Sequence, residues 1–169
     1  MNVLVDTSVW SIAFRRSRAP SRNDSPIVHE LTELIQEGRA LLIGPIRQEL
    51  LSGVSDARQF KDLRDRLRAF TDLSIHGFDY ERAAEFYNSC RHAGVQGSHM
   101  DFLICSIAAG NGAAIFTLDK DFSSYAKHVP ITLHEARAQH AQRLTGSSSE
   151  TAIDKADGRT EHIHVDHGD

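Results

Sequence analysis

Residues 3–10, VLVDTSVW, are the stretch that decides the fold class. A short aliphatic run ends in Asp6, which is the pattern of a buried strand with an acid at its carboxyl end. Thr7 and Ser8 commonly occur at helix starts, and Val9 and Trp10 supply apolar residues directly after them. The stretch therefore predicts a strand, a turn and the first residues of a helix.

Strand-like and helix-like segments alternate outward from this stretch. Apolar runs predict further strands at residues 40–43, 73–75, 113–117 and 129–132. Helical spacing and start signals predict helices at 27–36, 45–52, 56–70, 79–90, 101–109 and 121–126. Parallel strands need crossover helices, so this alternation predicts an α/β fold. We expect an α/β/α sandwich with a mostly parallel central sheet.

Length and composition favour one domain with a polar tail. With 169 residues and 40% hydrophobic content, the chain can fill a single core, which we place in residues 1–143. Residues 144–169 are rich in Ser, Gly, Asp and His, and we expect a disordered C-terminal tail there. Cys90 and Cys105 lie in helix-like segments and are expected to be free, buried thiols. The chain shows no signal-peptide core and no membrane span, so we expect a soluble, cytoplasmic protein without membrane contact.

The charge distribution leaves nucleic-acid binding to local patches. The formal net charge of −4 does not indicate a nucleic-acid binder by bulk electrostatics. One segment, RRSRAPSR, carries Arg15, Arg16, Arg18 and Arg22. These side chains could bind RNA phosphates or could belong to a solvated loop, and the sequence favours neither interpretation.

Five acids stand at places where an α/β fold builds sites. In open sheets, ligands bind beyond the carboxyl ends of the strands, where Asp6 is expected. Asp119 and Asp121 follow the strand at 113–117, so they would meet Asp6 if the two strands are neighbours. Asp101 begins an apolar helix, and Glu49 lies one turn into another helix beside its core face. Each acid also has an ordinary alternative: a helix cap for Asp6 or Asp101, a solvated position for Glu49, a turn for Asp119 or Asp121.

Carboxylates gathered without matching cations would repel one another, and a hard divalent cation removes that conflict. Oxygen ligands of this kind suit Mg²⁺ or Mn²⁺ and disfavour a structural zinc site. A bound ion of this class can generate hydroxide near neutral pH and orient a phosphodiester. The acids therefore predict phosphodiester hydrolysis.

The strings VLVDTSVW, IRQELLSGV, GVQGSHMDFLICSIAA and IFTLDKDF, taken in this order, resemble the successive motifs of PIN domains, specifically of VapC-type toxins. The resemblance covers most of residues 1–135. It implies an acidic quartet of Asp6, Glu49, Asp101 and Asp119. Asp6, Asp101 and Asp119 would bind the metal, and Asp6 and Asp101 are the two acids most expected to contact it directly. Thr7 or Ser8 would hold the site's geometry or a water, and Asp121 could replace or support Asp119.

The resemblance also implies a function and partners. Members of this family are endoribonucleases, often homodimers, and are silenced by an antitoxin protein. We therefore expect a metal-dependent endoribonuclease that acts on RNA, inhibits translation or growth, and binds a cognate antitoxin. Two alternatives are a housekeeping PIN-type nuclease and a metal-dependent phosphatase with Asp6 as nucleophile. The common phosphatase pattern has a second Asp two residues after the first, where this chain has Ser8.

Overall fold

The computed structural model describes residues 1–14 and 25–137. Met1–Ala136 form one compact unit, which contains every element described below. The expected domain boundary after residue 143 and the tail at 144–169 lie outside the described residues, so both stay predictions.

A five-stranded parallel sheet forms the centre of this unit. Its strands are β1 (Val3–Val5), β2 (Ala40–Ile43), β3 (Asp72–Leu73), β4 (Ala114–Phe116) and β5 (Thr132–Leu133). They lie in the order β3-β2-β1-β4-β5, and each neighbouring pair is parallel. Leu4 of β1 stands opposite Leu41 of β2 and Ile115 of β4. The expected parallel sheet is confirmed, with β1 in its middle.

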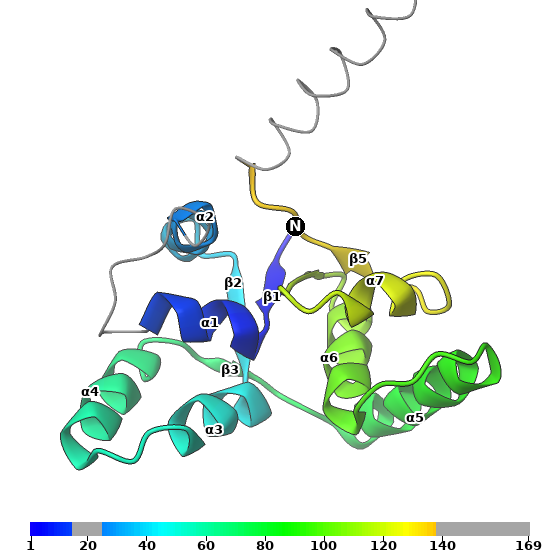
Figure 1. Cartoon of the computed structure of the whole chain (residues 1–169), viewed down its shortest axis with the longest axis horizontal. Coiled ribbons are helices and arrows are strands. Elements are labelled where there is room, and N and C mark those ends of the chain that lie inside the picture. Colours follow the sequence, from blue (N-terminus) through cyan, green and yellow to red (C-terminus); the bar gives the residue numbers. More distant parts are fainter. Residues whose placement is uncertain (15–24, 138–169) are drawn as a thin grey trace, which may run out of the picture. The chain divides into compact units, whose positions relative to one another are not determined.

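Helices connect the strands and cover the sheet. Those in the described residues are α1 (Thr7–Phe14), α2 (Ser25–Gln36), α3 (Gly44–Ser52), α4 (Ala57–Leu67), α5 (Gly77–His92), α6 (His99–Gly110) and α7 (Asp121–Tyr125). In Figure 1, α1 to α4 lie to the left of β1, and α5 to α7 lie to its right. The α/β/α sandwich expected from the alternation of elements is confirmed.

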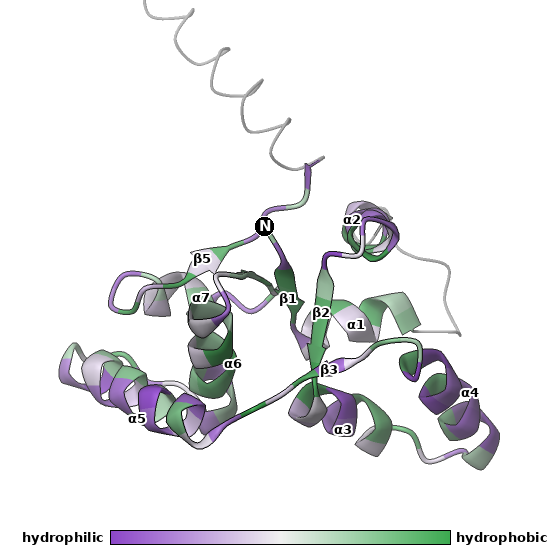
Figure 2. Ribbon diagram, turned by 180° about the vertical axis from the view of Figure 1, so that it is seen from behind, coloured by the Kyte–Doolittle hydropathy of each residue, from purple (hydrophilic) through white to green (hydrophobic). Residues whose placement is uncertain are grey.

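The core lies between the central strands and their helices. Every residue of β1 and β4 is buried, as expected for parallel strands covered on both faces. Figure 2 shows β2 and α6 as largely hydrophobic, whereas α4 is mostly hydrophilic. Cys90 and Cys105 are buried and free, as expected, and burial raises the pKa of both thiols. Their place in the core makes them packing groups.

Most helices and strands begin or end within one or two residues of the sequence expectation, and three larger or better-explained differences have a local physical reason. The helix expected to reach Phe70 ends at Leu67, because the last residues close a turn in which the Phe70 N–H donates to the Leu67 carbonyl. The third strand, expected at 73–75, begins one residue earlier and ends at Leu73, and its Asp72 pairs with the Arg47 guanidinium at 2.7 Å. The last strand starts only at Thr132, since turns follow α7 as far as Val129 and Pro130 has no amide hydrogen to donate.

A buried acid outside the candidate site takes part in hydrogen bonds that connect α5 to α6. Asp79 is 4% exposed, and its carboxylate accepts hydrogen bonds from the His76 backbone N–H at 2.9 Å and from Arg82 at 2.5 Å. Arg82 also donates to the Ser106 hydroxyl at 3.0 Å, which in turn donates to the Asp79 carbonyl at 2.7 Å. An added Cβ at Gly110 would overlap the Arg82 guanidinium. The polar groups of Asp79 therefore serve helix packing.

Across residues 1–14 and 25–137, the helices are all too short or too polar to span a bilayer.

Candidate active site

Asp6 lies where β1 ends and α1 begins, and it is 9% exposed. Its Oδ2 accepts hydrogen bonds from the Ser8 hydroxyl at 2.6 Å and the Thr117 hydroxyl at 2.9 Å. The Ser8 backbone N–H lies 3.4 Å from the same oxygen, so Asp6 also caps α1 weakly. Among the described residues no donor bonds to the other oxygen, Oδ1. Within the described residues, Oδ2 of Asp6 is therefore hydrogen-bonded and Oδ1 is not.

Thr117 joins Asp6 to the acids that follow β4. Its hydroxyl donates to Asp6 and accepts the backbone N–H of Asp119 at 3.0 Å. Asp119 Oδ1 in turn accepts the backbone N–H of Asp121 at 2.9 Å, which closes a turn at the start of α7. Both acids are exposed. The two strand ends do meet, as expected, but a threonine hydroxyl is the group that contacts Asp6.

Glu49 of α3 reaches the same edge of the sheet. Its Oε2 accepts a hydrogen bond of 2.9 Å from the hydroxyl of Thr7, the first residue of α1. Glu49 is exposed and Thr7 is half-buried. The contact places the Glu49 side chain beside the residue that follows Asp6, as a site shared by α1 and α3 requires.

Asp101 lies in the first turn of α6. Ser98 caps the helix: its hydroxyl accepts the Asp101 N–H at 3.1 Å, while its own N–H donates to Asp101 Oδ2 at 2.9 Å. The same oxygen accepts the Tyr125 hydroxyl at 3.2 Å. As with Asp6, the hydrogen bonds that the carboxylate accepts go to Oδ2, and within the described residues none goes to Oδ1.

The charges of three of the acids affect the pKa of Tyr125. Burial, followed by the charge of Asp101 and its hydrogen bond, raises the pKa of the Tyr125 hydroxyl well above its usual range. The charges of Asp121 and Asp119 raise the pKa further in the same direction. The phenol is protonated at neutral pH, as an ordinary tyrosine is, and its hydroxyl donates to the Asp101 carboxylate.

The donor atoms at this edge suit a hard cation that keeps its waters. In the part of the chain that the structure describes, no three His, Cys, Asp or Glu side chains are close enough together to hold a metal ion. Mg²⁺ commonly needs only one or two protein carboxylates, because waters and substrate phosphates complete its octahedron. Asp6 and Asp101 each have one carboxylate oxygen, Oδ1, without a hydrogen-bond donor among the described residues, which is the type of ligand that Mg²⁺ uses. An oxygen-only set does not favour zinc.

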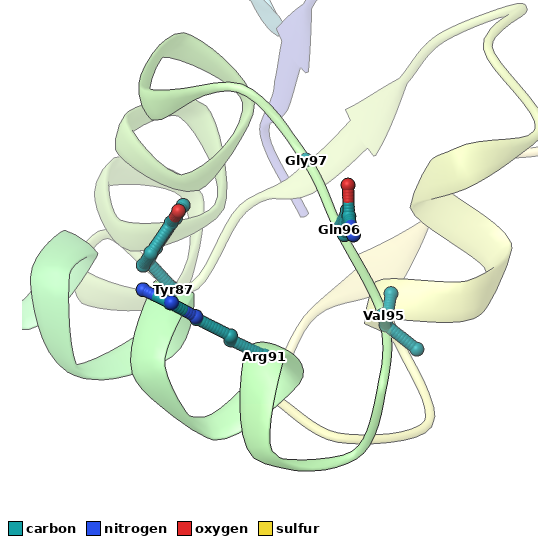
Figure 3. Close-up of a pocket in the computed structure, with 5 residues that line it drawn as sticks. All are labelled: Tyr87, Arg91, Val95, Gln96 and Gly97. Atoms are coloured by element: carbon teal, nitrogen blue, oxygen red, sulfur yellow. The ribbon is translucent and has the colours of Figure 1, made fainter.

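A cavity of about 260 Å³ adjoins the segment that carries Ser98 and Asp101. Figure 3 shows its lining: Tyr87 and Arg91 come from α5, and Val95, Gln96 and Gly97 from the connection between α5 and α6. Within the described residues, the Arg91 guanidinium has no ion-pair partner. The cavity therefore offers an unpaired cation close to the helix start that holds Asp101.

Sequence reasoning did not assign a role to Thr117 or Tyr125. Thr117 stands two residues before Asp119, so its place at a strand end was a usable signal. Tyr125 is spaced with Phe122 as an ordinary core residue would be, and no local pattern connects it with Asp101. Arg15, Arg16, Arg18 and Arg22 lie outside the described residues, so their RNA contact stays a prediction.

The fold and this edge together define a class: an all-parallel α/β/α protein with carboxylates at the carboxyl ends of its central strands. The sequence model of the PIN domain matches residues 3–128. The chain belongs to the PIN-domain family, a family of nucleases, and the resemblance seen in its motifs is confirmed. No curated protein matches the sequence.

Solved structures of low sequence identity share the fold. FitAcB from Neisseria gonorrhoeae superposes with a TM-score of 0.65 at 20% identity, covering 79% of this chain and 97% of that chain. VapBC2 from Rickettsia felis, bound to a DNA fragment from its promoter, gives 0.61 at 19% identity and covers 79% and 98%. VapBC-1 from nontypeable Haemophilus influenzae gives 0.61 at 12% identity and covers 80% and 98%. At these identities the likeness establishes the fold.

Proposed function

We propose that this chain is a metal-dependent endoribonuclease and the toxin of a toxin–antitoxin pair. The observation that carries the nuclease proposal is the same hydrogen-bonding pattern at two carboxylates. Asp6 and Asp101 each have Oδ2 held by hydrogen-bond donors of the protein, whereas Oδ1 has no donor within residues 1–14 and 25–137. Membership of the PIN-domain family supports phosphodiester hydrolysis as the reaction.

Each acid has a part in this proposal. Asp6 and Asp101 would hold Mg²⁺ or Mn²⁺ through Oδ1, and Asp119 or Asp121 would add a carboxylate from the next strand end. When bound, the ion supplies a hydroxide nucleophile near neutral pH and neutralises charge on the phosphodiester. The chain's own hydroxyls orient the acids: Ser8 and Thr117 hold Asp6, and Thr7 holds Glu49. Hydrolysis adds one water across a phosphorus–oxygen bond of the RNA chain.

Metal-dependent cleavage of RNA is the first expected result. Purified protein incubated with single-stranded and structured RNA should produce discrete cuts in Mg²⁺ or Mn²⁺. EDTA should stop cleavage and excess metal should restore it, because the proposed site needs a bound cation to activate water and to offset the charge of its carboxylates. Gel electrophoresis of end-labelled RNA measures this. Metal-dependent hydrolysis of a phosphomonoester with no RNA cleavage would instead support the phosphatase alternative.

Toxicity and its relief are expected from the second part of the proposal. The structures of FitAcB, VapBC2 and VapBC-1 share the fold, which supports a partner of the antitoxin kind. Induced expression of the chain should arrest growth, and co-expression of a short protein encoded beside it should restore growth and co-purify with it. Light scattering of the purified chain tests the expected homodimer. Growth unaffected by high expression of active nuclease would favour a housekeeping role.

A further inference from the structure

Tyr125 of α7 places a hydroxyl group at the carboxylate of Asp101. Its side chain is fully buried, with 0% of its surface exposed. Its hydroxyl oxygen lies 3.2 Å from Asp101 Oδ2 and 3.4 Å from the Gln96 carbonyl oxygen. A phenol has one hydrogen to donate, and an ionised carboxylate at the shorter distance is the stronger acceptor. Tyr125 therefore donates to Asp101.

The surrounding packing leaves this hydroxyl little freedom to move. The ring of Tyr125 lies 4.9 Å from Phe102 of α6 and 5.3 Å from Phe122 of α7, measured between ring centroids. Gly97 provides the remaining space, because a Cβ there would overlap the Tyr125 hydroxyl and lie 2.7 Å from its Cζ. The chain therefore has a glycine at the point where the Tyr125 hydroxyl packs against the backbone.

The contact determines which oxygen of Asp101 is available. Ser98 N–H and the Tyr125 hydroxyl both bind Oδ2. Asp6 shows the same arrangement, with the Ser8 and Thr117 hydroxyls on its Oδ2. In both acids the second oxygen, Oδ1, has no hydrogen-bond donor among the described residues. Oδ1 is therefore the oxygen that each carboxylate has available for a metal ion.

We propose that Tyr125 is a positioning residue of the nuclease site, whose hydroxyl orients the Asp101 carboxylate so that Oδ1 binds the divalent cation. This inference rests on the proposed function, because it assigns Asp101 to the metal. Hydrogen-bond partners of metal-ligating carboxylates typically change metal affinity or activity by about 10- to 100-fold when they are removed. Tyr125 would contribute in that range without touching the RNA.

Tyr125→Phe is the direct test, since it removes the hydroxyl and keeps the ring. Mn²⁺ binding, measured by titration calorimetry without RNA, should weaken by about tenfold or more. RNA cleavage should fall at low Mn²⁺ and recover at high Mn²⁺, with kcat at saturation little changed. A purely structural role would lower the melting temperature without moving the Mn²⁺ affinity.

Tyr87→Phe is a matched control. The Tyr87 ring also packs on Phe102, at 5.5 Å, but within the described residues its hydroxyl bonds to nothing. Its Mn²⁺ affinity should equal that of the unmodified protein. Gly97→Ala provides a second route to the same effect, because the added methyl group would displace the Tyr125 hydroxyl. It should weaken Mn²⁺ binding in the same direction, and it keeps the test available if Tyr125→Phe folds poorly.

The outcomes distinguish a failure of the positioning role from a failure of the proposed metal site. If Asp101→Asn weakens Mn²⁺ binding while Tyr125→Phe and Gly97→Ala leave it unchanged, the positioning role is overturned and the metal site stands. If Asp101→Asn also binds Mn²⁺ as the unmodified protein does, the assigned site fails and the role of Tyr125 fails with it. Weakened binding in all three variants, with Tyr87→Phe unchanged, supports the inference.

Discussion

Replacing Asp6 with asparagine is expected to reduce metal-dependent RNA cleavage by about a thousandfold or more, which corresponds to a loss of roughly 4 kcal/mol of transition-state stabilisation. The Ser8 and Thr117 hydroxyls need an acceptor at the position of Oδ2. The asparagine carbonyl oxygen will satisfy them there, which turns the NH₂ group to the position of Oδ1. The variant then presents a hydrogen-bond donor where the proposed site needs a metal ligand.

The measurement is the rate of RNA cleavage in saturating Mn²⁺, with circular dichroism to show that the fold is kept. Asp56→Asn is the matched control. It removes the same charge from an exposed acid that caps α4 by accepting the Gln59 N–H at 2.8 Å, and asparagine caps helices equally well. Its cleavage rate should match that of the unmodified protein. Undiminished turnover by a folded Asp6→Asn variant would reject the assigned site.

Trp10→Ala is expected to lower the free energy of unfolding by about 3–5 kcal/mol, a large share of the roughly 5–15 kcal/mol that stabilises an ordinary domain. Trp10 is fully buried in α1, stacked on Phe14 at 5.6 Å and edge-on to Phe70 at 5.1 Å. Its indole N–H donates to the Val5 carbonyl at 3.1 Å. Alanine would leave both a cavity and a buried carbonyl without its donor.

Urea denaturation monitored by circular dichroism measures this loss. Ile35→Ala provides the comparison, because Ile35 is also a large apolar residue but is 38% exposed on α2. Its effect should stay below about 1 kcal/mol, as is usual for surface positions. Similar effects of the two variants would show that the Trp10 side chain does not contribute to the core as this packing indicates. Since Val5 directly precedes Asp6, the same packing supports the residue at the centre of the site.

Local patterns predicted the central elements better than the edges of the sheet. The strand at residues 40–43 has the bounds expected from its apolar run, and β1 and β4 lie within theirs. The short edge strands β3 and β5 begin at other residues than their sequence patterns predicted. Central strands are buried on both faces and therefore carry a continuous apolar signal. The position of an edge strand depends more on individual contacts, such as the pairing of Asp72 with Arg47, which connects residues distant in the sequence.

The same distinction holds for the candidate site. The sequence by itself determined the class of fold, the family, and the acids that follow strands or begin helices, because these depend on local patterns and on the order of motifs. Only the tertiary structure decided which groups hold those acids. Thr117 reaches Asp6 across 111 residues, Glu49 reaches Thr7 across 42, and Tyr125 reaches Asp101 across 24. Such contacts follow from strand order and helix packing, which bring distant residues together at one edge of the sheet.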